Sequence, residues 1–196
     1  MIIGHYATAL IPHQKYPKAP LWLFLFAAIF LDAIWLTLAL FGLEVPHPGG
    51  FLDASLLNLQ VDMPWSHDLL PVLGWSVLMA IIALALTRST PVALWCAALV
   101  LVHEASDLLG GFKHYVYGAD SQLIGLGLYN TIPELALLFE ALLGVACTAW
   151  FVRARKNQGK SISAGGVKLL YAIFIGGAAM QLVFARVSLG SLIGLG

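Results

Sequence analysis

Charged side chains are scarce in this chain, and their scarcity argues against a water-soluble domain. Only 10% of its 196 residues are Asp, Glu, Lys or Arg, whereas 60% are hydrophobic. The mean hydropathy is +0.89, and a soluble domain carries about 25% charged residues. The polar surface is therefore too small to cover a globule in water, and we expect a lipid bilayer to be the solvent.

Net charge and cysteine are also lacking. The formal net charge is zero, so nothing indicates a nucleic-acid partner. The two cysteines, Cys96 and Cys147, both lie in apolar runs, so we expect no disulfide framework. No internal repeat or low-complexity segment interrupts the chain, and its length fits a single domain over residues 1–196.

Long apolar runs are abundant and predict the architecture. A helix needs about 20 apolar residues to cross roughly 30 Å of hydrocarbon. Five runs reach or approach this length, at residues 21–43, 69–86, 91–109, 135–152 and 169–189. The sequence therefore predicts an all-α, polytopic membrane helical bundle of about five transmembrane helices. The first run contains Asp32 and lacks a small-x-small cleavage site, so we interpret it as a retained span rather than a signal peptide.

Two segments lie outside these spans. Residues 1–20 form an N-terminal segment that contains His5, and composition leaves two alternatives open for it. It is either an amphipathic interfacial segment or a short re-entrant helix that reaches roughly 18 Å into the membrane. Residues 153–166 are polar and contain glycine and serine, which predicts a cytoplasmic linker before the last span.

The basic residues predict the orientation of the bundle. With five spans, eight loop lysines and arginines fall on one side: Lys15, Lys18, Arg88, Arg153, Arg155, Lys156, Lys160 and Lys168. Of the loop cations, only Lys113 falls on the other side. The positive-inside rule makes the basic side cytoplasmic, so we expect a cytoplasmic N-terminus and outward-facing loops at 44–68 and 110–134.

Ionisable residues in and beside the spans indicate a functional site, because such groups are costly in a membrane. Asp32 lies near the middle of the first span. His103 and Asp107 are four residues apart and share one face of the third span. His67 and Asp68 precede the second span at the same outward end, since the second and third spans should form an antiparallel hairpin.

Imidazoles and carboxylates that converge in a dry setting suit a divalent ion such as zinc. An ion would also explain how buried carboxylates stay ionised. A single His-x-x-x-Asp pair on a helix is often only structural. The convergence of several such groups at one end favours a metal site with Asp32, His67, His103 and Asp107 as its main ligands, and Asp62 as an additional candidate.

The order of these motifs resembles a family of bacterial inner-membrane metal-dependent hydrolases. That family has a THxxxG-like start, a PDxD element, an HRGxTHS element and an HxxxDxxT element. In this chain "GHYATAL" supplies His5, "FLDAIW" supplies Asp32, "DMPWSHD" supplies Ser66 and His67, and "HEASDLLGG" supplies His103 and Asp107. The match covers residues 1 to about 115. The resemblance implies a metal-binding membrane bundle, adds His5 to the ligands, and implies hydrolase activity.

The chain departs from the family pattern at several positions. The proline and one aspartate of PDxD are missing. Asp62 stands where the first histidine of HRGxTHS would be, and Met63 and Pro64 replace its arginine and glycine. Asp62 can still bind a metal. The arginine that is missing here would pair with an anionic substrate through hydrogen bonds, so the chain lacks that contact.

Four further ionisable residues lie in or near the last three predicted spans and have structural as well as functional interpretations. We interpret His114, in a glycine-flanked segment, as an exposed loop histidine, and Glu104 as a second-choice general base. Glu134 follows Pro133 at a helix start, where the helix dipole favours a carboxylate. Glu140 lies deeper and needs a partner, either the metal cluster or Arg186.

The functional hypothesis from sequence is an integral membrane metal-dependent hydrolase of the bacterial inner membrane. Its cofactor would be a divalent ion, with zinc expected, and Asp62 or Asp68 would accept the proton. The expected substrate is an ester or phosphoester of a lipid-like molecule taken from the membrane. Two alternatives stay open: a non-catalytic subunit bound to a membrane-protein partner, and a proton or cation transporter.

Overall fold

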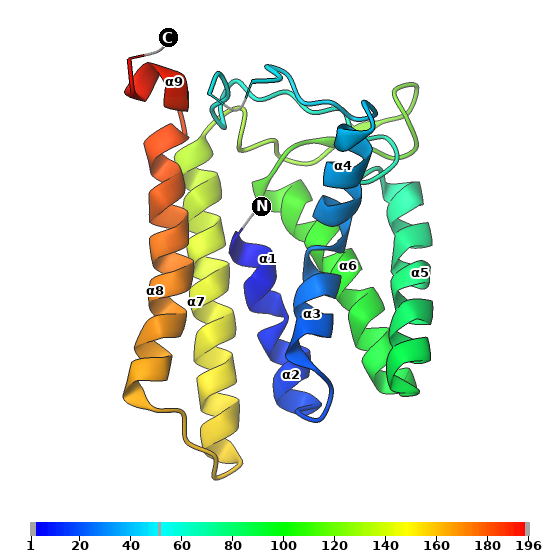
Figure 1. Ribbon diagram of the computed structural model, residues 1–196, viewed down its shortest axis with the longest axis vertical. Coiled ribbons are helices and arrows are strands. Elements are labelled where there is room, and N and C mark those ends of the chain that lie inside the picture. The colour runs from blue at the N-terminus through cyan, green and yellow to red at the C-terminus, as the bar shows by residue number, and fades with distance from the viewer. Residues whose placement is uncertain (1–2, 51, 195–196) are drawn as a thin grey trace.

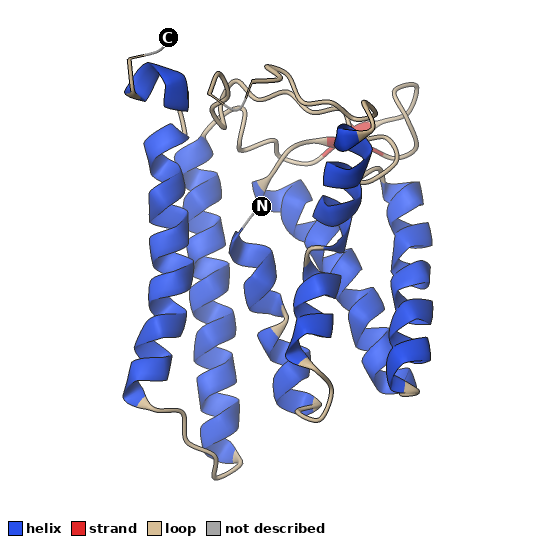
Figure 2. Ribbon diagram, viewed as in Figure 1, coloured by secondary structure: helices blue, strands red, loops and turns tan. Residues whose placement is uncertain are grey.

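The computed structural model describes residues 3–50 and 52–194, and within them the chain is an all-α bundle (Figures 1 and 2). The helices are α1 (Ile3–Thr8), α2 (Leu10–Lys15), α3 (Leu21–Ala28), α4 (Phe30–Leu40), α5 (Leu69–Thr87), α6 (Thr90–Gly110), α7 (Pro133–Asn157), α8 (Ala164–Gln181), the 3-10 turn η1 (Leu182–Phe184) and α9 (Leu189–Leu192). Two short antiparallel strands, β1 (His114–Tyr115) and β2 (Leu123–Ile124), pair His114 with Ile124. The predicted fold class is confirmed.

Four helices are long and apolar enough to cross a membrane. They are α5, α6, α7 and the run Ala164–Phe184 that combines α8 with η1, and the bent pair α3–α4 makes a fifth span if counted as one. Many large apolar side chains on these helices are exposed, for example Leu73 and Val77 on α5 and Leu94 on α6. Such outward apolar faces fit a multi-pass membrane protein.

The first predicted span is not one straight helix. α3 and α4 meet at Ile29 with a bend of 61°. Neither proline nor glycine lies at this break, so the usual sequence signals for a kink are missing. The carbonyl of Ala28, at the end of α3, instead accepts a hydrogen bond from Nδ1 of His103 at 2.7 Å. A tertiary contact therefore marks the bend and places Asp32 in the first turn of α4.

The N-terminal helices lie inside the bundle, which decides between the two alternatives for residues 1–20. α1 packs against α3, α6, α7 and α8, and α2 packs against α3 and α7. Ala7 and Leu10 are buried in a cluster with Cys147, Phe151 and Phe174. α1 begins part-way along α7 and the chain then runs to the α2–α3 turn (Figure 1). The N-terminal segment is therefore packed inside the bundle and does not lie along its surface.

The two ends of the bundle differ in structure. One end, called here the basic end, carries the α2–α3 turn, the α5–α6 turn and the α7–α8 loop (Figure 1). The opposite end, called the loop end, carries the long irregular segments 41–50, 52–68 and 111–132. The predicted linker 153–166 was too long, because α7 continues to Asn157 and α8 begins at Ala164. Arg and Lys are good helix formers, and cations stabilise a helix C-terminus.

Candidate metal centre

Five side chains that the sequence singled out meet inside the bundle. His5 comes from α1, Asp32 from α4, and His67 from the turn that precedes α5. His103 and Asp107 come from successive turns of α6. Two overlapping groups have ligand atoms within 4.8 Å of one another: His5, His103 and Asp107, and Asp32, His67 and His103. Segments far apart in the sequence thus contribute to one cluster, which we call the His/Asp cluster.

The spacing of the donor atoms fits one shared ion. Nε2 of His5 lies 3.2 Å from Oδ1 of Asp107, and Nε2 of His103 lies 3.4 Å from Oδ2 of the same carboxylate. Asp32 Oδ1 lies 3.7 Å from Nε2 of His103 and 3.8 Å from Nε2 of His67. Donors at about 2.1 Å from a tetrahedral zinc ion are about 3.4 Å apart. The observed distances lie around that value.

Several imidazole nitrogens in the cluster lack ordinary partners. Among the residues that the structure describes, Nε2 of His103 and both ring nitrogens of His5 are buried without a hydrogen bond. The two rings stack with their centroids 3.6 Å apart. A buried polar atom without a partner is costly. Nitrogens of this kind beside carboxylate oxygens are suitable donors to a cation.

His103 limits how many ions this set of residues can hold. Both ligand groups include His103. Its Nδ1 is within hydrogen-bond distance of the Ala28 carbonyl at 2.7 Å, which fixes the ring and leaves Nε2 as the ligand atom. Because one nitrogen can bind one ion, the two groups cannot each hold an ion through His103.

His67 is oriented by a relay that the sequence did not reveal. Its Nδ1 lies 2.8 Å from Oγ of Ser66, and that hydroxyl donates to Oε2 of Glu44 at 2.6 Å. Oε1 of Glu44 also accepts the backbone N–H groups of Trp65 and Ser66. This arrangement holds Nε2 of His67 toward the cluster, as outer partners of metal-binding histidines commonly do.

His5 is positioned by a buried carboxylate on α7. Glu140 accepts the backbone N–H of Ile3 at 2.9 Å and that of Gly4 at 3.2 Å. It also accepts a hydrogen bond from the hydroxyl of Tyr129. These bonds satisfy donors at the start of α1 inside the membrane region. Arg186, the other predicted partner of Glu140, pairs with Glu134 through Nη2 and Oε2 at 3.0 Å.

The two predicted proton acceptors lie on the loop side of the cluster. Asp68 is buried, and its oxygens accept the backbone N–H groups of Tyr115 at 3.0 Å and Gly118 at 2.6 Å. Burial raises the pKa of Asp68 above its usual value, although these two bonds oppose the shift. Asp62 is exposed and has no hydrogen bond or ion pair within the described part of the chain. Neither residue belongs to the groups that could hold the ion.

The interpretation of His114 as an exposed loop residue is wrong. Its exposure is 3%, and its ring stacks on that of His67 with centroids 5.3 Å apart. Burial lowers the pKa of His114 to about 3, which keeps the imidazole neutral. The pairing of β1 with β2 folds its segment back over the cluster. Glu104 is also buried, and its two oxygens lack a hydrogen-bond partner among residues 3–50 and 52–194.

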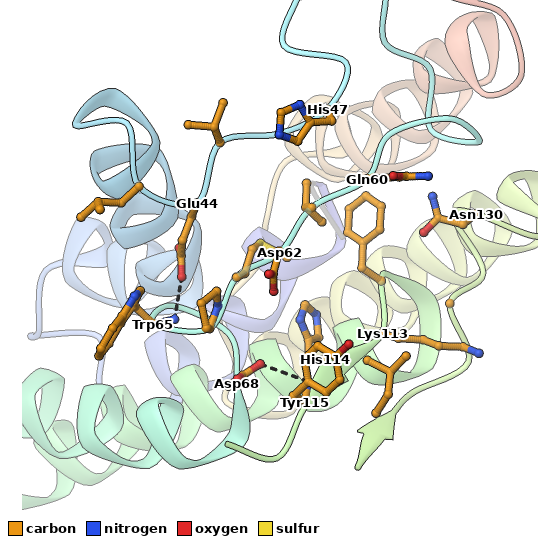
Figure 3. Close-up of a pocket in the computed structure, with 18 of the residues that line it drawn as sticks. Glu44, His47, Gln60, Asp62, Trp65, Asp68, Lys113, His114, Tyr115 and Asn130 are labelled. Atoms are coloured by element: carbon orange, nitrogen blue, oxygen red, sulfur yellow. Dashed lines mark hydrogen bonds between the residues drawn. The ribbon is translucent and has the colours of Figure 1, made fainter. Parts of the chain in front are cut away.

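An open pocket of about 1120 Å³ lies at the loop end beside the cluster (Figure 3). Polar residues from three segments line it, including Glu44, His47, Asp62, Asp68 and His114. His114 connects it to the cluster through its contact with His67. The polar pocket is therefore separated from the His/Asp cluster by the His114 ring.

Comparisons with known proteins give this site no precedent. No family model, curated protein or solved structure matches the chain. The residues of the site are therefore the basis for the function proposed below.

Proposed function

We propose that this protein is an integral membrane hydrolase that uses one divalent ion to cleave an ester or phosphoester of a lipid-like substrate. The observation that carries the proposal is the convergence of His5, His67 and His103 with two carboxylates inside an apolar bundle. The sequence resemblance to bacterial inner-membrane metal-dependent hydrolases motivates the same proposal. Among the described residues four apolar helices, or five with the bent pair α3–α4, are long enough to span a membrane, and we place the protein in the bacterial inner membrane.

The ion would be held by His103, which both groups share, with its other ligands drawn from His5, Asp32, His67 and Asp107, and zinc is the metal that we propose. Three imidazoles and two carboxylates form a donor set that suits zinc. When bound, such an ion activates water and polarises a substrate oxygen. The Ser66–Glu44 relay and the Ala28 carbonyl hold two of the imidazoles in place before any substrate arrives.

The chain must also supply a proton acceptor. Asp62 and Asp68 both line the pocket at the loop end. The oxygens of Asp68 are engaged by backbone N–H groups, whereas Asp62 has no such partner among the described residues. We therefore assign the role of general base to Asp62 first and to Asp68 second.

The basic end of the bundle would face the cytoplasm. Arg88 and the cations of the α7–α8 region lie there, as the positive-inside rule requires. The loop end, with its pocket, would then face outward. A phosphatase reporter fused after residue 194 should be active outside the cytoplasm, and activity only of a cytoplasmic reporter at that point would overturn the orientation.

Metal analysis of the purified protein tests the metal site. We expect about one zinc ion per wild-type chain, and far less in a folded Asp107→Asn variant, because the amide keeps the shape but loses the charge. Glu134→Gln, which changes an exposed carboxylate paired with Arg186, is the matched control and should keep its metal. Equal metal content in the two variants would exclude Asp107 as a ligand.

Hydrolysis of fluorogenic phospholipid esters and phosphoesters tests the activity. The zinc-loaded wild type and Glu134→Gln should cleave one of these bond types, and the Asp107→Asn protein should not. A metal-loaded wild type that cleaves neither would overturn the hydrolase proposal while leaving the metal site standing.

A further inference from the structure

A second hollow, which we call the apolar groove, lies beside the bent span. Its volume is about 450 Å³, within the roughly 300–1,000 Å³ that ligand sites occupy. It is formed by residues of α3, α4 and α5 and by two residues of the connection between α4 and α5. These residues are Phe26, Phe30, Ala33, Ile34, Thr37, Leu38, Leu43, Trp65 and Trp75. Thr37 is the only lining residue with a hydroxyl, and its Oγ1 donates to the Ala33 carbonyl at 2.7 Å. The surface offered to an occupant is therefore almost wholly hydrocarbon.

The apolar groove adjoins the polar pocket at the loop end. Leu43 and Trp65 line both hollows. The indole N–H of Trp75 donates to the Trp65 carbonyl at 2.7 Å, which fixes the wall between α5 and the loop. The backbone N–H of Trp65 donates to Glu44, the carboxylate that also holds Ser66 next to His67. One set of bonds thus shapes the junction and orients a metal ligand.

The His/Asp cluster lies next to both hollows. Asp32 is flanked in α4 by groove residues, among them Ala33, and its side chain is 32% exposed. The Asp107 and His103 side chains are 7% and 0% exposed. Asp32 is thus the cluster residue that is accessible near the groove. On the pocket side, the cluster is covered by His114, which stacks on His67.

We propose that the apolar groove and the polar pocket together bind one membrane phospholipid with an amine-bearing, zwitterionic head group. An acyl chain lies in the groove, and the head group lies in the pocket. This inference deepens the proposed function, since it names the class of lipid that the metal site would meet. A phospholipid fits because it joins a hydrocarbon chain to a polar head, and the apolar groove and the polar pocket lie side by side at Leu43 and Trp65.

The charges in the pocket select the head group. The carboxylate oxygens of Glu44 accept hydrogen bonds from backbone N–H groups and from the Ser66 hydroxyl, and those of Asp68 accept backbone N–H groups. Asp62 is left as the carboxylate without a partner in the described part of the pocket, and an ammonium group would pair with it. With such a head group bound, the role of general base passes to Asp68, the second choice. Lys113 also lines the pocket, but Figure 3 shows its ammonium extending away from Asp62. A net anionic head group would therefore meet repulsion rather than a cation.

Native mass spectrometry of the delipidated protein, reloaded with palmitoyl-oleoyl phosphatidylethanolamine, tests the inference. Wild-type protein should retain about one lipid per chain. Thr37→Trp places an indole in the apolar groove and should reduce retention about tenfold or more, because the acyl chain loses the space for several methylene groups. Leu36→Trp is the matched control: Leu36 is 54% exposed on the same helix but does not line the groove, so retention should be unchanged.

Three comparisons make the result decisive. Equal retention by Thr37→Trp and Leu36→Trp would overturn the groove as the site. Retention of phosphatidylglycerol as strong as that of phosphatidylethanolamine would overturn the head-group assignment, and Asp62→Asn should abolish any preference. Lipid retention does not require the metal, so Asp107→Asn should still bind phosphatidylethanolamine. If the wild-type protein binds the lipid but no metal, the proposed function is wrong and this inference stands. If it binds metal but not the lipid, this inference is wrong and the metal site stands.

Discussion

Two buried polar regions of this bundle lie close together and are built differently. Around Glu140, the chain supplies the donors itself: the Tyr129 hydroxyl and the backbone N–H groups of Ile3 and Gly4. In the His/Asp cluster, Nε2 of His5 and Nε2 of His103 lie 3.2 and 3.4 Å from the oxygens of Asp107, and neither nitrogen has a well-aligned hydrogen bond among the described residues.

The difference separates a structural polar group from a ligand-binding one. A buried carboxylate with donors from its own chain needs nothing more to be stable. Imidazole nitrogens that are buried and unbonded leave a cost that a cation would remove. On this reading Glu140 supports the fold and positions His5, whereas the cluster is the place where a ligand is required.

The largest expected effect comes from removing the shared ligand. His103→Ala should lower zinc affinity by at least about 100-fold, the upper end of what a lost outer partner costs, because a direct ligand is removed. Isothermal titration with zinc measures this change. His13→Ala, a histidine of α2 outside the cluster, should titrate like the wild type. Equal zinc affinities for His103→Ala and His13→Ala would show that His103 is not a zinc ligand.

The next effect concerns stability rather than metal. Glu140→Leu removes the acceptor of up to three buried donors, so the free energy of unfolding should fall by about 1–3 kcal/mol. Denaturation in detergent mixtures should show this loss both with zinc and with a chelator. Glu140→Gln keeps an acceptor oxygen and should lose less. A loss that appears only with zinc present would make Glu140 part of the metal centre.

The smallest effect tests the relay behind His67. Ser66→Ala removes the hydroxyl between Nδ1 of His67 and Glu44 and should weaken zinc binding by about tenfold. Ser106→Ala is the control, because its hydroxyl bonds only the Val102 carbonyl one turn away on α6. If both serine variants bind zinc as tightly as the wild type, the relay does not orient the ligand.

Much of this architecture could be predicted from local sequence. Apolar runs near 20 residues long located α5, α6, α7 and α8, because hydrocarbon thickness sets the length of a spanning helix. The four-residue spacing of His103 and Asp107 placed them on one face of α6, where Nε2 and Oδ2 are 3.4 Å apart. An ionisable residue inside an apolar run then indicated Asp32, and an ionisable pair just before one indicated His67.

Other features followed from contacts between distant segments. The bend at Ile29 has no proline or glycine and coincides with the bond from His103 to Ala28. The burial of His114 requires the β1–β2 pairing that folds its loop over His67. No local pattern could reveal either one, because both depend on residues more than 40 positions away in the chain.

The sequence by itself determined the solvent, the helical class and the residues able to bind a cation, since hydropathy and side-chain chemistry are local properties. Only the tertiary structure decided that His5 lies in the cluster, because Glu140 on α7 holds the start of α1 inside the bundle. It also decided that Asp68 is tied to the 114–118 turn and that the apolar groove meets the polar pocket at Trp65. These outcomes depend on which segments pack together, and packing is a property of the whole chain.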